Sequence, residues 1–198
     1  GMMVHRGKAY QDLQHGVVEK IRKVLDIDSE VYIAPASASG FLEGCVRSAV
    51  DVKMAGLSNG SFGDRWQLIG QENGKQVQKI NGEWGKALRA SHLAGKLDKD
   101  VEAVTFVSNE SSTGVLNPVQ EIVDEIRKQS DALIMVDGVT SVGAVDLRLR
   151  KLDLDALVFG SQKALALPPG LAVVCVSQRL MEQAVKVKNR GYYQIGRA

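Results

Sequence analysis

A lysine and an aspartate occupy positions in the sequence at which their side chains could act in catalysis or ligand binding. Lys163 follows the apolar run 156–159 and has small and apolar neighbours. A desolvated lysine has a lowered pKa, which makes its amine a usable nucleophile or base. Asp137 follows the apolar run 132–136, and a buried carboxylate needs a cationic or hydrogen-bonding partner. Taken singly, the lysine is more often an ordinary surface lysine, and the aspartate could equally be a structural carboxylate.

Two further segments have the composition of ligand-binding loops. The small residues 36–40 lead from an apolar run directly into a helical stretch, and Ser37 and Ser39 add hydroxyl donors. Because backbone N–H groups at a helix start attract anions, this segment could hold a phosphate. Its spacing matches neither a P-loop nor a GxGxxG motif, and a serine-capped helix would have the same sequence. Residues 108–114 form a dense polar cluster that could equally be a simple turn.

Short apolar runs alternate with helical stretches along the chain, and this order predicts an α/β fold with a mostly parallel sheet. We expect strands at 31–34, 52–57, 76–80, 101–107, 132–136, 156–159 and 171–176, and helices at 11–25, 40–50, 63–73, 84–97 and 118–129. The continuous hydrophobicity of 132–136 indicates a central strand buried on both faces. A three-layer, doubly wound sheet with helices on both faces follows. Asn117, Pro118 and Gln120 predict the start of the last helix, with Asn117 as its cap.

All four candidate segments follow predicted strands. In open parallel sheets, ligands bind beyond the carboxyl ends of the strands, so these segments should meet at one edge. Together they offer an anion cradle, an acid that can pair with a ring nitrogen, and a lysine that can form a Schiff base. Pyridoxal 5′-phosphate (PLP) requires these three protein parts.

Three motifs resemble one known family in their order, spacing and residues. They are Asn-Glu-Ser-Ser-Thr-Gly-Val-Leu-Asn-Pro at 109–118, Val-Asp-Gly-Val-Thr-Ser at 136–141, and Ser-Gln-Lys-Ala-Leu at 161–165 followed by Pro-Pro-Gly at 168–170. The sequence resembles the class V aminotransferases of the PLP fold-type I superfamily, near the serine–pyruvate and alanine–glyoxylate branch. The resemblance runs from His5-Arg6 to Gly191-Tyr192-Tyr193.

The resemblance assigns roles to the catalytic pair and to the residues around the cofactor ring. It implies that Lys163 is the Schiff-base lysine and moves the proton, and that Asp137 pairs with the protonated ring nitrogen. Phe62 would stack on one face of the ring, and Val139 would pack on the other. Ser112 would hydrogen-bond the ring hydroxyl.

The resemblance also implies which residues contact the phosphate. Ser37, Ala38, Ser39 and Gln162 match the phosphate-contacting positions, although residues 36–40 contain less glycine than the family form. Cysteine desulfurases of the same superfamily typically carry histidine before the lysine, so Gln162 favours the aminotransferase branch.

The implied reaction is transamination between an amino acid and a 2-oxo acid, with serine or alanine as donor and pyruvate or glyoxylate as acceptor, in a homodimer. Residues 1–198 match the PLP-binding large domain, truncated at both ends. The small C-terminal domain, which carries the arginine for the substrate carboxylate, would be absent, so activity could be impaired. A non-catalytic PLP-binding or dimerising fragment remains open. So does another PLP reaction, of the phosphoserine aminotransferase, desulfurase or lyase type.

Composition excludes several other classes of protein. The chain has 198 residues, 44% hydrophobic and 24% charged, with a formal net charge of +2, so we expect one soluble domain that binds neither nucleic acid nor membranes. The longest apolar run, 171–176, is far shorter than the roughly 20 residues that span a bilayer. Three scattered histidines give no metal site. Cys45 and Cys175 are predicted to be reduced, buried thiols, which favours the cytoplasm or an organelle matrix.

Overall fold

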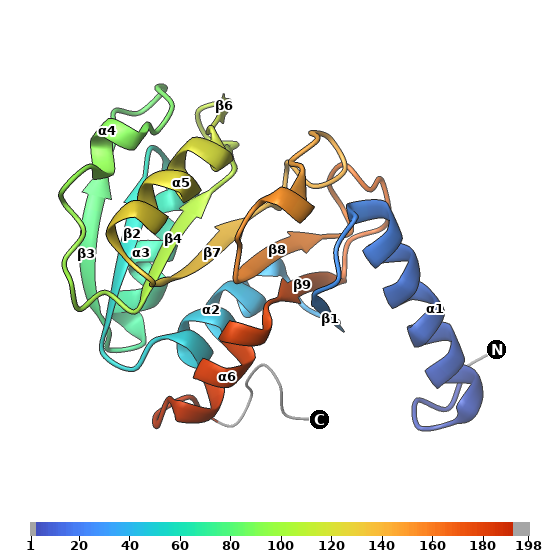
Figure 1. Ribbon diagram of the computed structural model, residues 1–198. Helices are drawn as coiled ribbons and strands as arrows, with labels where there is room; N and C mark the ends of the chain where they lie inside the picture. Colours follow the sequence, from blue (N-terminus) through green and yellow to red (C-terminus); the bar gives the residue numbers. More distant parts are fainter. Residues whose placement is uncertain (1–2, 192–198) are drawn as a thin grey trace.

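A seven-stranded sheet forms the centre of the computed structural model, which describes residues 3–191 (Figure 1). The strand order is β1-β9-β8-β7-β4-β2-β3, with β1 (Glu30–Ala34), β2 (Lys53–Ser58), β3 (Gln76–Asn81), β4 (Ala103–Val107), β7 (Leu133–Asp137), β8 (Ala156–Gly160) and β9 (Ala172–Val176). Strands β3, β2, β4, β7 and β8 are parallel, and β9 runs opposite to both of its neighbours. The predicted mostly parallel sheet is confirmed. Tyr192 and Tyr193, the end of the family-like stretch, lie outside the described residues.

Helices cover both faces of this sheet and give the predicted three layers. They are α1 (Lys8–Leu25), α2 (Ala38–Ala49), α3 (Ser61–Glu72), α4 (Ala90–Leu93), α5 (Val119–Gln129) and α6 (Gln178–Lys186), with a 3₁₀ turn at Leu149–Lys151. One core cluster packs α2, α3 and α6 on one face, through side chains such as Leu42 and Trp66. A second cluster packs α1, α4 and α5 on the other face, through side chains such as Ile122. Strand β7 is buried along its whole length, as its continuous hydrophobicity predicted.

Three elements differ from the prediction. The helix expected over 84–97 is reduced to α4, because Gly85 and Gly95 adopt positive φ angles of 82° and 68° that interrupt a helix. Helix α6, which was not predicted, begins where the Ser177 hydroxyl accepts a hydrogen bond from the N–H of Leu180. The polar cluster contains a short hairpin of β5 (Asn109–Glu110) and β6 (Val115–Leu116).

Asn117 does not cap α5, so this part of the prediction is wrong. Pro118 occupies the cap position, and the buried Asn117 side chain points back into the loops. Its Nδ2 donates to the carbonyl of Val107 at 2.8 Å, and its Oδ1 accepts from the N–H of Leu88 at 2.8 Å and from Asn59 at 2.9 Å. Asn117 therefore ties the end of β4 to two neighbouring loops.

Cys45 and Cys175 are buried free thiols, as predicted. Burial raises the pKa of both, that of Cys175 to about 12, so neither readily forms a thiolate. Within residues 3–191, no helix is both long enough and apolar enough to cross a membrane. The cellular compartment stays a prediction.

Candidate functional site

A cavity of about 200 Å³ opens at the carboxyl ends of the parallel strands, where the sequence places its four candidate segments. Fourteen residues from five segments of the chain line it: Ser37, Ala38, Ser39, Leu42, Phe62, Arg65, Val107, Asn109, Ser111, Asp137, Val139, Thr140, Gln162 and Lys163. The structure therefore brings together every predicted site residue except Ser112.

Asp137 is the last residue of β7 and lines this cavity, with 4% of its surface exposed. Its Oδ1 accepts a hydrogen bond from the backbone N–H of Val139 at 2.8 Å. Burial raises the pKa of Asp137 from 3.8 to about 6; the Val139 N–H and the cations of Arg65 and Lys163 oppose the rise, and Glu110 adds to it. The required hydrogen-bond partner is present. No side-chain cation contacts the carboxylate within the described residues.

Lys163 also lines the cavity, but its side chain is exposed, so the expectation of a desolvated lysine is not met. The loop that carries it is closely tied. The Ser161 hydroxyl donates to the carbonyl of Pro168 at 2.7 Å, and the N–H of Ala166 donates to the carbonyl of Lys163 at 2.9 Å. The backbone of Lys163 is therefore fixed beside β8, while its amine is accessible to a ligand.

Glu110 orients the start of α3, a role that the sequence reasoning missed. Its buried carboxylate accepts hydrogen bonds from the N–H groups of Phe62 at 3.1 Å and Gly63 at 3.0 Å. An anion at this position satisfies unpaired N–H groups and favours the helix dipole. Gly60 permits the close approach, because a Cβ there would lie 2.5 Å from Cγ of Glu110. The sequence contains one signal for this role, namely an acidic residue within a polar segment that follows a buried strand.

Ser112 does not line the cavity. Its hydroxyl donates to Oε1 of Glu110 at 2.7 Å and accepts from the N–H of Ser61 at 3.0 Å. Its neighbour Ser111 lines the cavity and donates to Oγ1 of Thr140 at 3.1 Å. The cavity is therefore lined by Ser111 and not by Ser112, since the turn within the hairpin decides which of two adjacent hydroxyls faces it.

Arg65 is a second residue that the sequence reasoning missed. It lies three residues after Phe62 on α3, a spacing that places both on one helix face. Its guanidinium carbon is 4.7 Å from the centre of the Phe62 ring, and its Nη1 donates to Oγ of Ser39 at 3.3 Å. Arg65 thus bridges the predicted ring-stacking residue and the predicted phosphate cradle.

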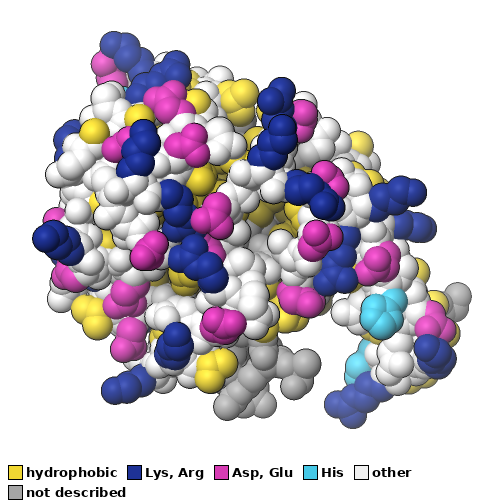
Figure 2. All heavy atoms as spheres, in the orientation of Figure 1, with side chains coloured by type: hydrophobic (Ala, Val, Ile, Leu, Met, Phe, Trp, Pro, Cys, Tyr) yellow, Lys and Arg dark blue, Asp and Glu magenta, His cyan; other side chains and the backbone are white. Residues whose placement is uncertain are grey.

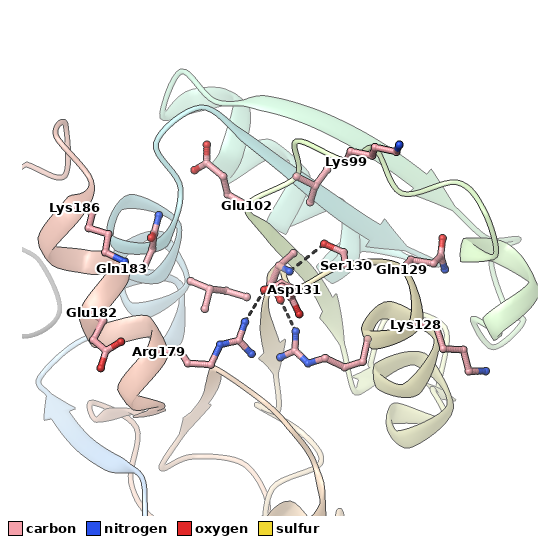
Figure 3. A pocket seen from close by; sticks show the side chains of 14 residues that line it. Lys99, Glu102, Lys128, Gln129, Ser130, Asp131, Arg179, Glu182, Gln183 and Lys186 are labelled. Carbon is pink, nitrogen blue, oxygen red and sulfur yellow. Dashed lines mark hydrogen bonds between the residues drawn. The ribbon is translucent and has the colours of Figure 1, made fainter.

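A larger hollow, of about 840 Å³, lies at the opposite edge of the sheet, where β4 and β7 begin (Figure 3). Its two arginines are already engaged with the protein. Arg127 donates to the carbonyl of Ala132 at 2.6 Å and pairs with Asp155 at 3.0 Å, while Arg179 donates to the carbonyl of Asp131. These contacts hold the start of β7, so the hollow has a structural explanation and is not our candidate site.

Comparisons with known proteins show which family the chain is similar to. The chain matches the model of the family "Aminotransferase class-V" over residues 61–194. The soluble hydrogenase 42 kDa subunit of Anabaena cylindrica is 35% identical, over 96% of this chain and 51% of the relative. The L-aspartate–glyoxylate aminotransferase of Paracoccus denitrificans is 31% identical, over 90% of this chain and 47% of the relative.

Among solved structures, a phosphoserine aminotransferase from Cytophaga hutchinsonii superposes with a TM-score of 0.89 at 28% identity, covering 98% of this chain and 55% of that chain. The chain spans about half the length of the curated relatives it matches.

Proposed function

Because the chain belongs to the class V aminotransferases, which are PLP-dependent, we propose that its cavity binds PLP and that the protein transfers an amino group from an amino acid to a 2-oxo acid. The observation that carries this proposal is the convergence of Asp137 and Lys163 on one cavity whose rim includes the start of α2. A carboxylate, an amine and an anion cradle are the three groups that the cofactor needs.

The chemistry of the lining residues fits PLP. Among the described residues no cation contacts the buried carboxylate of Asp137, and a protonated ring nitrogen would supply one. The amine of Lys163 is accessible for the aldehyde. Ser37 and Ser39 stand at the start of α2, where unpaired N–H groups favour a phosphate. Phe62 offers a flat apolar surface beside them.

When bound, PLP supplies an electron sink that stabilises negative charge at the amino acid Cα. Lys163 would hold the cofactor through its Nζ, and the same amine, when free, would carry the Cα proton. Asp137 would pair with the protonated ring nitrogen, and the N–H of Val139 holds that carboxylate in orientation. Ser111, in place of Ser112, is the hydroxyl that we assign to the ring oxygen.

We further propose serine or alanine as the amino donor and glyoxylate or pyruvate as the acceptor. The resemblance of three motifs to the serine–pyruvate and alanine–glyoxylate branch supports this choice. The name of the L-aspartate–glyoxylate relative supports glyoxylate as an acceptor.

Borohydride trapping tests the cofactor assignment directly. The chain is incubated with PLP, reduced with borohydride, digested, and mapped by peptide mass spectrometry. We expect a pyridoxyl adduct on Lys163 that disappears in Lys163→Ala and persists in Lys20→Ala, which removes an exposed lysine on α1. An unmodified Lys163 in the wild-type chain would overturn the proposal.

A second assay separates transamination from the alternatives. Alanine and glyoxylate are added to the PLP-loaded chain, and pyruvate and glycine are measured. Both products should form, and neither should form with Lys163→Ala. An adduct on Lys163 without amino transfer would overturn the transfer step and favour a PLP-binding fragment, whereas sulfide release from cysteine would favour a desulfurase.

We also propose that the chain forms a homodimer through α1. This helix stands out from the body of the protein (Figures 1 and 2) and buries only Val18. Its apolar side chains Leu13 and Val24 are 53% and 71% exposed, and such a stripe usually drives association. Light scattering should report a dimer or larger species, shifted toward monomer by Leu13→Glu. A wild-type monomer at working concentrations would contradict the proposal.

A further inference from the structure

We propose that Arg65 is a ligand of the cofactor phosphate and that it determines the preference of this site for PLP over pyridoxal. The assignment rests on the proposed function, because it concerns the same cavity. It adds a residue that neither the three sequence motifs nor the predicted phosphate cradle includes.

A comparison of the charged side chains that line the cavity leaves Arg65 as the candidate phosphate ligand. Of the residues that the structure describes, three with ionisable side chains line it, namely Arg65, Asp137 and Lys163. Asp137 is an anion and would repel a phosphate, and the amine of Lys163 is needed for the aldehyde. The start of α2 contributes roughly half a positive charge, which is too little for a phosphate dianion in a partly enclosed site. Arg65 is the lining cation that remains.

The position of Arg65 agrees with this role. Its Nη1 lies 3.3 Å from Oγ of Ser39, the second residue of α2, so its guanidinium is already beside the N–H groups that would face an anion. Within residues 3–191 Arg65 forms no salt bridge. A guanidinium has five N–H donors, and its planar fork matches the geometry of phosphate oxygens. Several of these donors are therefore available to a ligand.

Phe62 gives the guanidinium its orientation. The two side chains stack at 4.7 Å, which restricts the long Arg65 side chain before any ligand arrives. The N–H of Phe62 is in turn held by Glu110. A side chain that is ordered in advance loses less entropy on binding, so this stacking should strengthen a phosphate contact.

A purely structural role for Arg65 is the competing explanation, and the phosphate group itself separates the two. Pyridoxal has the same ring and aldehyde as PLP but carries no phosphate. A structural defect would weaken binding of both compounds equally, whereas loss of a phosphate ligand weakens binding of PLP alone.

The test measures dissociation constants of PLP and pyridoxal by equilibrium dialysis for the wild-type chain, Arg65→Gln, Arg65→Lys and the control Lys20→Gln. We expect Arg65→Gln to weaken PLP binding by about tenfold to hundredfold, the usual effect of losing a charged hydrogen bond, and to leave pyridoxal binding nearly unchanged. Arg65→Lys should retain part of the preference, because it keeps the charge but loses the fork. Lys20→Gln, which removes a cation far from the cavity, should match the wild type.

Inorganic phosphate gives an independent measurement. It should compete with PLP in the wild-type chain and compete more weakly in Arg65→Gln. Equal weakening of PLP and pyridoxal, or an unchanged ratio of their dissociation constants, would overturn the role of Arg65 while the Lys163 adduct still supports the proposed function. Absence of that adduct in the wild-type chain would overturn both.

Discussion

Replacing Asp137 by asparagine should stabilise the cofactor-free protein at neutral pH, because the carboxylate is suited to a cationic ligand and unsuited to an empty cavity. The side chain is almost fully buried, and from residues 3–191 it accepts one hydrogen bond, donated by the N–H of Val139. An asparagine oxygen can accept that same bond without carrying a charge. The substitution therefore removes the unfavourable buried charge and leaves the local packing in place.

The magnitude follows from the pKa of Asp137, which burial raises from 3.8 to about 6. The folded protein consequently binds this proton more tightly than the unfolded chain does. Stability then falls as the pH rises from about 4 to about 6, and the full loss is present above pH 6. At about 1.4 kcal/mol for each unit of pKa difference, the ionised carboxylate lowers the free energy of unfolding by about 3 kcal/mol. The asparagine variant should recover up to this amount at neutral pH and almost none near pH 4.

Urea unfolding of both proteins at pH 7.5 and pH 4, without PLP, measures this difference. Asp155→Asn is the matched control, because Asp155 is equally buried but accepts hydrogen bonds from Ile134 at 2.8 Å, Ser177 at 2.7 Å and Arg127 at 3.0 Å. That variant should lose about 1 to 3 kcal/mol at pH 7.5, since it leaves partners unsatisfied. A variant of Asp137 no more stable than wild type at pH 7.5, or with equal gains at both pH values, would refute the reasoning.

Two further predictions concern the start of α3 and the glycines, and urea unfolding tests both. Glu110→Ala should lower the free energy of unfolding by about 1 to 3 kcal/mol, because it leaves buried N–H groups of α3 without acceptors; wild-type stability in this variant would argue against the capping role. Gly60→Ala should lower the free energy of unfolding by about 1 to 3 kcal/mol, because its Cβ would clash with Glu110. Gly16→Ala should raise it by about 0.5 to 1 kcal/mol, because the new Cβ lies in the middle of α1 and meets nothing within 4 Å. Equal effects of the two alanines would show that backbone preference rather than the clash decides.

The sheet and the grouping of the candidate residues at one cavity were predictable, because both depend on short-range sequence patterns. Each predicted strand is found within two residues of its expected bounds, since a buried parallel strand is a continuous apolar run with polar boundaries. Residues that follow such strands meet at one edge of the sheet. Lys163, Asp137 and Ser39 could therefore be grouped correctly although more than a hundred residues separate the first from the last.

The errors arise where a single residue decides the local geometry. Ser111 and Ser112 are equivalent in composition, and only the turn of the hairpin determines which of them faces the cavity. Asn117 has good capping chemistry, but three buried backbone and amide groups compete for its side chain. No sequence motif marked Arg65, because its proposed role depends on the approach of α3 to α2 in the folded chain.

The charged side chains that line the cavity are complementary to the charges of PLP. Within the part of the chain that the structure describes, Asp137 brings to the cavity a buried carboxylate that forms no ion pair, and Arg65 brings a guanidinium that forms no salt bridge. Without a ligand, the buried carboxylate lowers the free energy of unfolding, and the guanidinium has no anionic partner among the described residues. Neither charge then stabilises the folded chain. PLP carries the complementary arrangement, since its ring nitrogen can be protonated and its phosphate is anionic. The opposite expected effects of Asp137→Asn and Arg65→Gln, higher stability without PLP and weaker PLP binding, follow from this single arrangement of charge.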